Sequence, residues 1–315
     1  MIYIANDLHG VSHLISGVVA AISKMSEGDI LVINGDGAGA RGPIMNNVVK
    51  LYYEVRRGET EVKDLFSAVG EIIGEEPDIP QQWIYHSAHA GIFRKLLSDK
   101  YPKFETCMHE ELNAVISDTV SQISEAASAK GVKVVYSPGN GEIVTDDFII
   151  DDISVEKTVA PDERYYTKLA HRGFFSSRGV EYITYVKPLS DNTLIIGANL
   201  LDLSYEGAVS KLRECGALDS KSITNVIVHY PPTIAPIGGS FSFWSPNNSD
   251  VDRIGILGKI LKALSLDANH STVFFGHIHL GAKDARMDVL PSSMGFSLPN
   301  YRAIWIKPGS VISMN

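Results

Sequence analysis

The chain has few cysteines, no long apolar run and no excess of basic residues. Its two cysteines, Cys107 and Cys215, lie far apart among 315 residues and form no CxxC pattern. This excludes a disulfide framework and predicts a reducing compartment. No stretch approaches the roughly 18 apolar residues of a membrane span, and the first residues lack the basic and apolar regions of a signal peptide. We therefore expect a cytoplasmic protein with no membrane partner.

The charge balance disfavours another class of partner. The formal net charge is −9, which argues against broad electrostatic capture of nucleic acid or of anionic membranes. The remaining composition, 44% hydrophobic and 21% charged, is ordinary for a globular protein with a sizeable core.

Apolar strands alternate with an amphipathic helix at the start of the chain. Residues 2–5 and 29–34 are short apolar runs, and residues 11–25 between them carry apolar side chains at helical spacing. Such a βαβ unit predicts the α/β class, with a parallel-rich sheet covered by helices.

Residues 43–130 differ from this beginning, because their pattern is almost wholly helical. Apolar residues recur every three or four positions, as in the run from Phe104 to Ile123. We expect a helical lobe inserted into a single domain of residues 1–315. The lobe would serve as a cap over a site or as a contact in a homo-oligomer.

Strand patterns return after residue 130. Apolar runs end near Tyr136, His229 and His277, each followed by turn residues. The stretch 240–255 is rich in serine and asparagine and predicts a mobile loop. Residues 301–315 predict a terminal hairpin.

Polar residues of metal-ligand type follow five of the predicted strands. They are Asp7, His9, Asp36, Asn140, His229, His277 and His279. Ligands of open α/β sheets bind outside the carboxyl ends of the strands, and carboxylates and imidazoles suit divalent transition metals. Each residue alone also fits a turn former or an ordinary histidine. Their shared position after apolar strands predicts a common metal site.

In five separated segments the sequence resembles the calcineurin-like metallophosphoesterases. The segments are DLH at 7–9, GDGAGARG at 35–42, GN at 139–140, VHYPP at 228–232 and GHIH at 276–279. The resemblance covers residues 1–42 and 132–315 and leaves out the helical lobe. It implies a four-layer αββα sandwich with a dinuclear metal centre.

The resemblance also implies how the ligands divide between two divalent ions. Asp36 would bridge the ions. The remaining ligands would be Asp7, His9 and His279 on one ion and Asn140, His229 and His277 on the other. Manganese, iron, nickel and zinc all accept such nitrogen and oxygen ligands. Two cations roughly 3.5–4 Å apart lower the pKa of a shared water and clamp both oxygens of an in-line phosphoryl displacement.

Two segments depart from the family pattern, and both departures concern proton delivery. Gly141 stands where the family has a histidine after GN, and Ala40 stands where the phosphatase branch has an aspartate before Arg-Gly. In the family that histidine helps to protonate the leaving group and the aspartate orients it. The joint loss indicates that this chain does not use the pair, although general acid catalysis typically contributes about 10²–10⁴-fold.

Other side chains are candidates for phosphate binding and for the missing acid. Arg41 suits a phosphate because a guanidinium matches its geometry bidentately, and it equally fits a plain surface position. His13, one helical turn after His9, is a candidate acid and equally a helix-surface histidine. Weaker candidates are His86, His89 and His171, of which the first two share a helix face in the lobe.

The expected activity is metal-dependent hydrolysis of a phosphoric ester by a metal-bridging hydroxide. The catalytic residues would be Asp36, Arg41 and His13. A phosphodiesterase is favoured over a phosphomonoesterase because the phosphatase-type pair is missing. We expect a small phosphorylated substrate, with nucleic acid not favoured. Two alternatives stay open: a weakly active or inactive metal-binding scaffold on the same fold, and a nuclease.

Overall fold

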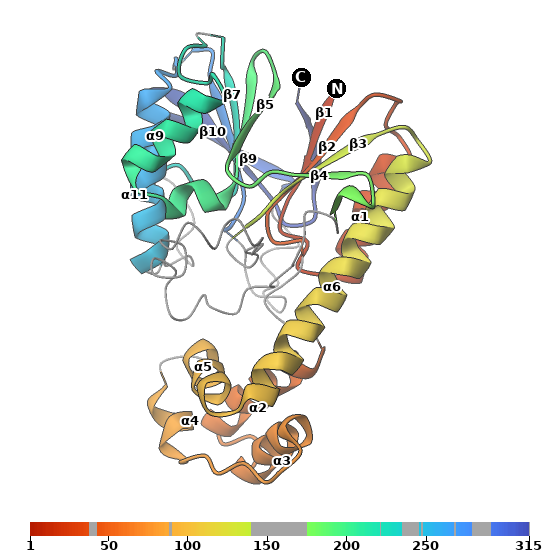
Figure 1. Ribbon diagram of the computed structural model, residues 1–315, viewed down its shortest axis with the longest axis vertical. Helices are drawn as coiled ribbons and strands as arrows, with labels where there is room; N and C mark the ends of the chain where they lie inside the picture. Colours follow the sequence, from red (N-terminus) through yellow and green to blue (C-terminus); the bar gives the residue numbers. More distant parts are fainter. Residues whose placement is uncertain are drawn as a thin grey trace.

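Two sheets surrounded by helices form the protein in the computed structural model (Figure 1). The structure describes residues 1–37, 43–87, 90–139, 175–220, 222–234, 246, 248–267, 269–278 and 291–314. The predicted α/β class is confirmed, because helices pack around sheets that contain both parallel and antiparallel strand pairs.

The first sheet joins the beginning of the chain to its end. Its order is β11-β1-β2-β3-β4, with bounds Val311–Met314, Ile2–Ala5, Ile30–Asn34, Lys133–Ser137 and Val180–Tyr182. Neighbours from β1 to β4 pair in parallel, and β11 is antiparallel to β1. Helices α1 (Ser12–Ile22) and α6 (Pro102–Ser128) contribute to a buried cluster with the outer face of this sheet. The predicted βαβ beginning is confirmed.

The second sheet belongs wholly to the later half of the chain. Its order is β5-β6-β7-β8-β10-β9, with bounds Val186–Ser190, Thr193–Ile196, Asn225–Val228, Thr272–Phe275, Tyr301–Ile306 and Ser293–Leu298. Pairs from β6 to β10 are parallel, and both outermost pairs are antiparallel. The 3₁₀ helix η2 (Ala198–Asp202) and helices α9 (Tyr205–Glu214) and α11 (Asn248–Ala263) share a buried cluster with this sheet.

The two sheets face each other across a third buried cluster. Ile4 and Val32 of the first sheet lie in this cluster with Ile195, Ile227 and Phe274 of the second. The carboxyl ends of the strands also adjoin. The side-chain amide of Asn34, at the end of β2, donates to the Val228 carbonyl at the end of β7 over 2.9 Å. Side chains that follow the strands of either sheet are therefore brought to one region.

Two sequence expectations were wrong. The terminal hairpin does not form, because β10 lies between β8 and β9 in the second sheet. Instead, β11 pairs with β1 at the edge of the first sheet. The second error concerns the predicted mobile loop at 240–255. Its last part is the first half of α11, where buried Arg253 and Ile254 hold the helix to the protein. Residues 240–245 and 247 lie outside the described residues.

The segment predicted as a helical lobe contains helices α2 to α6. The bounds of the first four are Pro43–Arg56, Val62–Ile73, Gln82–His86 and Ala90–Lys100. These helices enclose a cluster of their own, which includes Leu65 and Phe93. Helix α6 connects the two parts, since its Phe104 lies in the lobe cluster and its Ile116 lies in the cluster of the first sheet. Figure 1 shows the lobe projecting from the sheets at the N-terminal end of α6.

A membrane-spanning segment is not found among the helices of the described residues, α6 included.

Candidate metal centre

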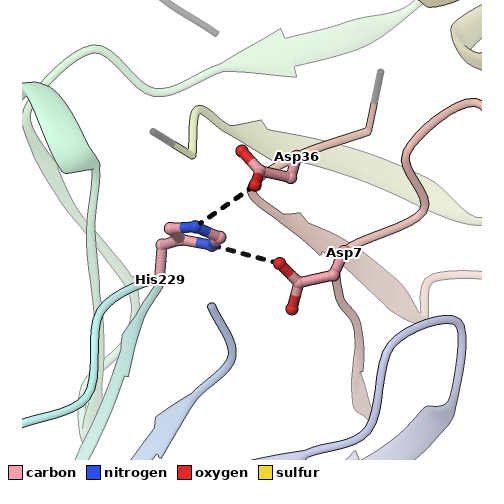
Figure 2. A group of neighbouring side chains, drawn as sticks. All are labelled: Asp7, Asp36 and His229. Carbon is pink, nitrogen blue, oxygen red and sulfur yellow. Dashed lines mark ion pairs between the residues drawn. The ribbon is translucent and has the colours of Figure 1, made fainter. Parts of the chain in front are cut away.

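Three predicted ligands, Asp7, Asp36 and His229, meet where the two sheets adjoin (Figure 2). Asp7 follows β1, Asp36 follows β2 and His229 follows β7. One ligand atom from each lies within 4.8 Å of the other two. The exposed fractions of the residues are 0%, 3% and 0%. Burying two carboxylates beside an imidazole is costly in free energy, and a divalent cation at the same place offsets that cost.

Hydrogen bonds between the loops after β1 and β2 hold the two carboxylates side by side. The backbone amide of His9 donates to the Asp36 carbonyl over 2.7 Å, and that of Gly10 donates to the Gly37 carbonyl over 2.8 Å. The spacing of Asp7 and Asp36 is therefore fixed by the backbone.

Positive backbone φ angles concentrate at this site. Asp7, His9, Asp36 and His277 have φ values of 50°, 51°, 46° and 64°, and among the described residues only Ser265 is a further non-glycine example. Such conformations are uncommon for residues with a Cβ and cluster at functional sites, where the surrounding structure enforces them. The strand ends are thus shaped to present these side chains at a local cost in free energy.

The two rings His229 and His277 stand at the spacing of a shared metal ion. Nε2 of His229 lies 3.3 Å from Nδ1 of His277 and 3.7 Å from Oδ2 of Asp36. Two imidazole nitrogens on one tetrahedral zinc ion would stand about 3.4 Å apart, given zinc–nitrogen bonds of about 2.0–2.1 Å. These three donor atoms therefore fit a divalent transition metal on the Nε2 side of His229, whereas Oδ1 of Asp7 lies 3.9 Å from Nδ1 of the same ring (Figure 2).

A backbone contact fixes which nitrogen of His229 is available. Nδ1 of His229 lies 3.2 Å from the carbonyl oxygen of Asn34, so this nitrogen carries the proton and donates it there. Burial lowers the pKa of His229 to about 4, while the nearby Asp36 carboxylate partly opposes this effect. The ring is therefore neutral at pH 7, as a metal ligand must be.

Two other predicted ligands adjoin the group. Nε2 of His9 lies 3.9 Å from Oδ1 of Asp7, and the His9 side chain is 23% exposed, so it borders solvent. The backbone amide of His277 donates to Oδ2 of Asp7 over 3.0 Å, which ties the end of β8 to the end of β1.

Sequence reasoning missed the buried asparagines behind the ligands. The amide of Asn6 donates to Asp7 Oδ2, and the amide of Asn34 donates to Asn6 Oδ1 over 3.3 Å. Partners of this kind orient metal ligands. The available signal was an asparagine before the first two ligand segments, in AND and INGD, but asparagine at a strand end is first interpreted as a turn former.

Glycine is required at two positions of the site. A Cβ on Gly35 would overlap the ring of His229, and a Cβ on Gly139 would overlap the carboxylate of Asp36. Gly139 therefore allows the end of β3 to approach the Asp36 carboxylate directly.

Other predicted site residues are exposed or lie outside the described residues. His13 has an exposed side chain at the second position of α1, and His86 is exposed at the end of α4. The predictions outside the described residues are those for Ala40, Arg41, His89, Asn140, Gly141, His171 and His279.

Three comparisons set the chain against known proteins. No family model matches the sequence, and no curated protein matches it. A solved crystal structure aligns over 98% of this chain and 90% of its own, with a TM-score of 0.41 and 13% sequence identity. A likeness this weak carries no argument about function.

Proposed function

We propose that the protein is a dinuclear metal-dependent phosphoesterase of the calcineurin-like type. The observation that carries the proposal is the buried group of Asp7, Asp36 and His229, at the carboxyl ends of strands from two facing sheets. Helices on the outer face of each sheet and an apolar cluster between the sheets support the four-layer αββα sandwich of that family.

The proposed ligand set extends beyond the three grouped residues. His9 and His277 are the nearest additions, because each has a ring nitrogen within 4 Å of a group member. Asn140 follows Gly139, which packs on Asp36, and His279 follows His277 by two residues. Together these seven residues would hold two divalent ions, with Asp36 between them.

Each part of the site would contribute a separate function. Bound divalent ions supply Lewis acidity and lower the pKa of water, which suits attack on phosphorus. The residues of the chain hold the ions in a buried place, and the neutral His229 leaves Nε2 ready to bind. Arg41 would orient a phosphate through two parallel hydrogen bonds.

The substrate is expected to be a phosphodiester with a good leaving group. The family's histidine after GN is replaced by Gly141, and its orienting aspartate is replaced by Ala40. His13, which is exposed at the start of α1, is the proposed substitute acid. A substrate whose leaving group departs readily as an anion depends less on protonation by a general acid.

Hydrolysis of chromogenic esters tests this proposal. The metal-stripped protein is supplied with manganese, nickel or zinc and assayed on bis(4-nitrophenyl) phosphate and on 4-nitrophenyl phosphate. We expect metal-dependent hydrolysis, faster on the diester, that is lost in Asp7→Asn and kept in a control, Asp191→Asn, at an exposed position.

Three other results would each contradict the proposed phosphoesterase activity. Metal binding without hydrolysis would identify a scaffold. Salt-dependent cleavage of DNA or RNA without cleavage of the small esters would identify a nuclease. Equal activity of the protein and of Asp7→Asn would exclude the proposed centre.

A further inference from the structure

Asp250 approaches the metal centre from a helix that no ligand motif includes. It lies in the first turn of α11 and is 5% exposed, and its Oδ1 stands 3.3 Å from Nε2 of His277. The two side chains are almost equally buried, at 7% and 8% exposed. A carboxylate and an imidazole therefore face each other in the interior, next to the proposed ligands.

The two nitrogens of His277 face different partners. Nδ1 lies 3.3 Å from Nε2 of His229, on the side of the proposed metal, whereas Nε2 faces Asp250. A ring in this position can bind a cation through only one of these nitrogens. The other nitrogen then carries a proton, which a carboxylate is well suited to accept in a hydrogen bond.

We propose that Asp250 is a positioning residue for the metal centre: it holds the proton of His277 on Nε2, so that Nδ1 is left to bind the metal. This inference rests on the proposed metal site. A ligating histidine whose second nitrogen is bound by a carboxylate has a fixed ring orientation and a higher basicity.

A buried ion pair one turn later secures α11 in the position that this role requires. Arg253 Nε donates to Asp202 Oδ1 of η2 over 2.6 Å, and its Nη1 donates to the hydroxyl of Tyr230 over 2.5 Å. Tyr230 follows His229, and its ring centroid lies 4.5 Å from that of His277. The contacts of Arg253 thus connect the helix that carries Asp250 to the residues beside both histidines.

Metal affinity measures the proposed role without depending on turnover. Metal-stripped Asp250→Ala and Asp250→Asn are titrated with zinc or manganese against a competing chelator. Removal of such a partner typically weakens metal binding by about 10–100-fold. We expect a loss of that size in Asp250→Ala and a smaller loss in Asp250→Asn, because the amide oxygen still accepts a hydrogen bond. The matched control is Asp252→Asn, two residues along the same helix and exposed, with affinity unchanged.

The protonated nitrogen of His277 provides a second readout in the zinc-loaded protein. Nitrogen-15 NMR of the imidazoles should show His277 protonated on Nε2 in the zinc-loaded unsubstituted protein, with this proton signal lost or shifted in zinc-loaded Asp250→Ala. Because this measurement needs no substrate, a protein that binds zinc with the other arrangement would fail this inference, whereas a protein that binds no zinc would fail the proposed function. If Asp250→Ala does not fold, the Asp250→Asn variant carries the test.

Two results would overturn the role of Asp250. Unchanged affinity and an unchanged tautomer in the Asp250 variants would show that the carboxylate is not needed. Loss of a whole equivalent of metal in Asp250→Asn would make Asp250 a direct ligand instead of a positioning residue.

Discussion

The strand ends and the helical lobe differ in the side chains that they group in the interior. At the strand ends, two carboxylates and two imidazoles are buried together, and several of these residues have positive φ angles. In the lobe, the buried cluster is apolar and residues such as Leu65 and Phe93 occupy regular helices. The strand ends thus carry the local strain, and the lobe follows ordinary rules of helix packing.

Function and stability should therefore depend on different regions of the protein. A substitution at the strand ends that removes a charge and keeps the side-chain size should weaken metal binding and catalysis with little loss of unfolding free energy. A substitution in the lobe that removes apolar volume should lower the unfolding free energy and leave metal binding and catalysis unchanged.

The largest effect is expected for Asp36→Asn. The substitution removes the charge between the two proposed ions, and metal ions supply several kcal/mol of transition-state stabilisation, so hydrolysis should fall roughly 10³-fold. The metal-free variant should melt at the same temperature or higher, because a buried carboxylate is replaced by a neutral group of equal size. Steady-state kinetics and calorimetry measure the two effects. A large drop in melting temperature without loss of activity would show that Asp36 serves stability and not catalysis.

In the lobe, Leu97→Ala should cost about 3 kcal/mol of unfolding free energy, because it leaves a cavity at a fully buried position. Metal affinity should not change, since Leu97 belongs to the lobe cluster alone. Urea denaturation and metal titration measure the two quantities. The control Ile44→Ala, at an exposed position, should stay within about 0.5 kcal/mol. If metal affinity fell together with stability, the lobe and the metal centre would not be independent.

Asn34, a buried asparagine behind the ligands, should affect both unfolding free energy and metal affinity. Asn34→Ala removes the hydrogen bonds to Val228 and Asn6 and should cost about 1–3 kcal/mol of unfolding free energy. It also frees the orientation of Asp7 through Asn6, so metal affinity should fall as well. The exposed Asn46→Ala in α2 is the control and should change neither. A loss of stability with full metal affinity would limit Asn34 to a structural role.

The smallest effect is expected at the start of α3. Asp64 accepts hydrogen bonds from the Thr60 hydroxyl over 2.8 Å and from the Glu61 amide over 3.3 Å. Asp64→Ala should therefore cost roughly 0.5–1 kcal/mol of lobe stability. Native-state hydrogen exchange of α3 measures it, with exposed Glu71→Ala on the same helix as the control. Equal exchange in both variants would show that the cap contributes nothing.

The sequence predicted the beginning of the fold and the grouped ligands for one reason. Apolar spacing located β1, α1 and β2, and Asp7 and Asp36 each stand two residues after the end of a strand. Parallel strands end at one edge, so local patterns were enough to bring these residues together. The same reasoning located His229 after β7.

Local sequence patterns did not predict the contacts between distant parts of the chain. The pairing of β11 with β1 joins opposite ends of the sequence, and nothing local distinguishes it from a hairpin. Asp250 lies in a run rich in serine, asparagine and aspartate that resembles a loop, and its burial depends on the packing of α11. Only the folded structure places it beside His277.

The number of metal ions bound per chain is the most direct measure of a dinuclear centre that depends on Asp36. The protein and Asp36→Asn are equilibrated with zinc or manganese, freed of unbound metal and measured by elemental analysis against protein concentration. We expect two ions per chain in the protein and a loss of bound metal in Asp36→Asn. A protein that retains no metal, or the same amount in both forms, would contradict this expectation.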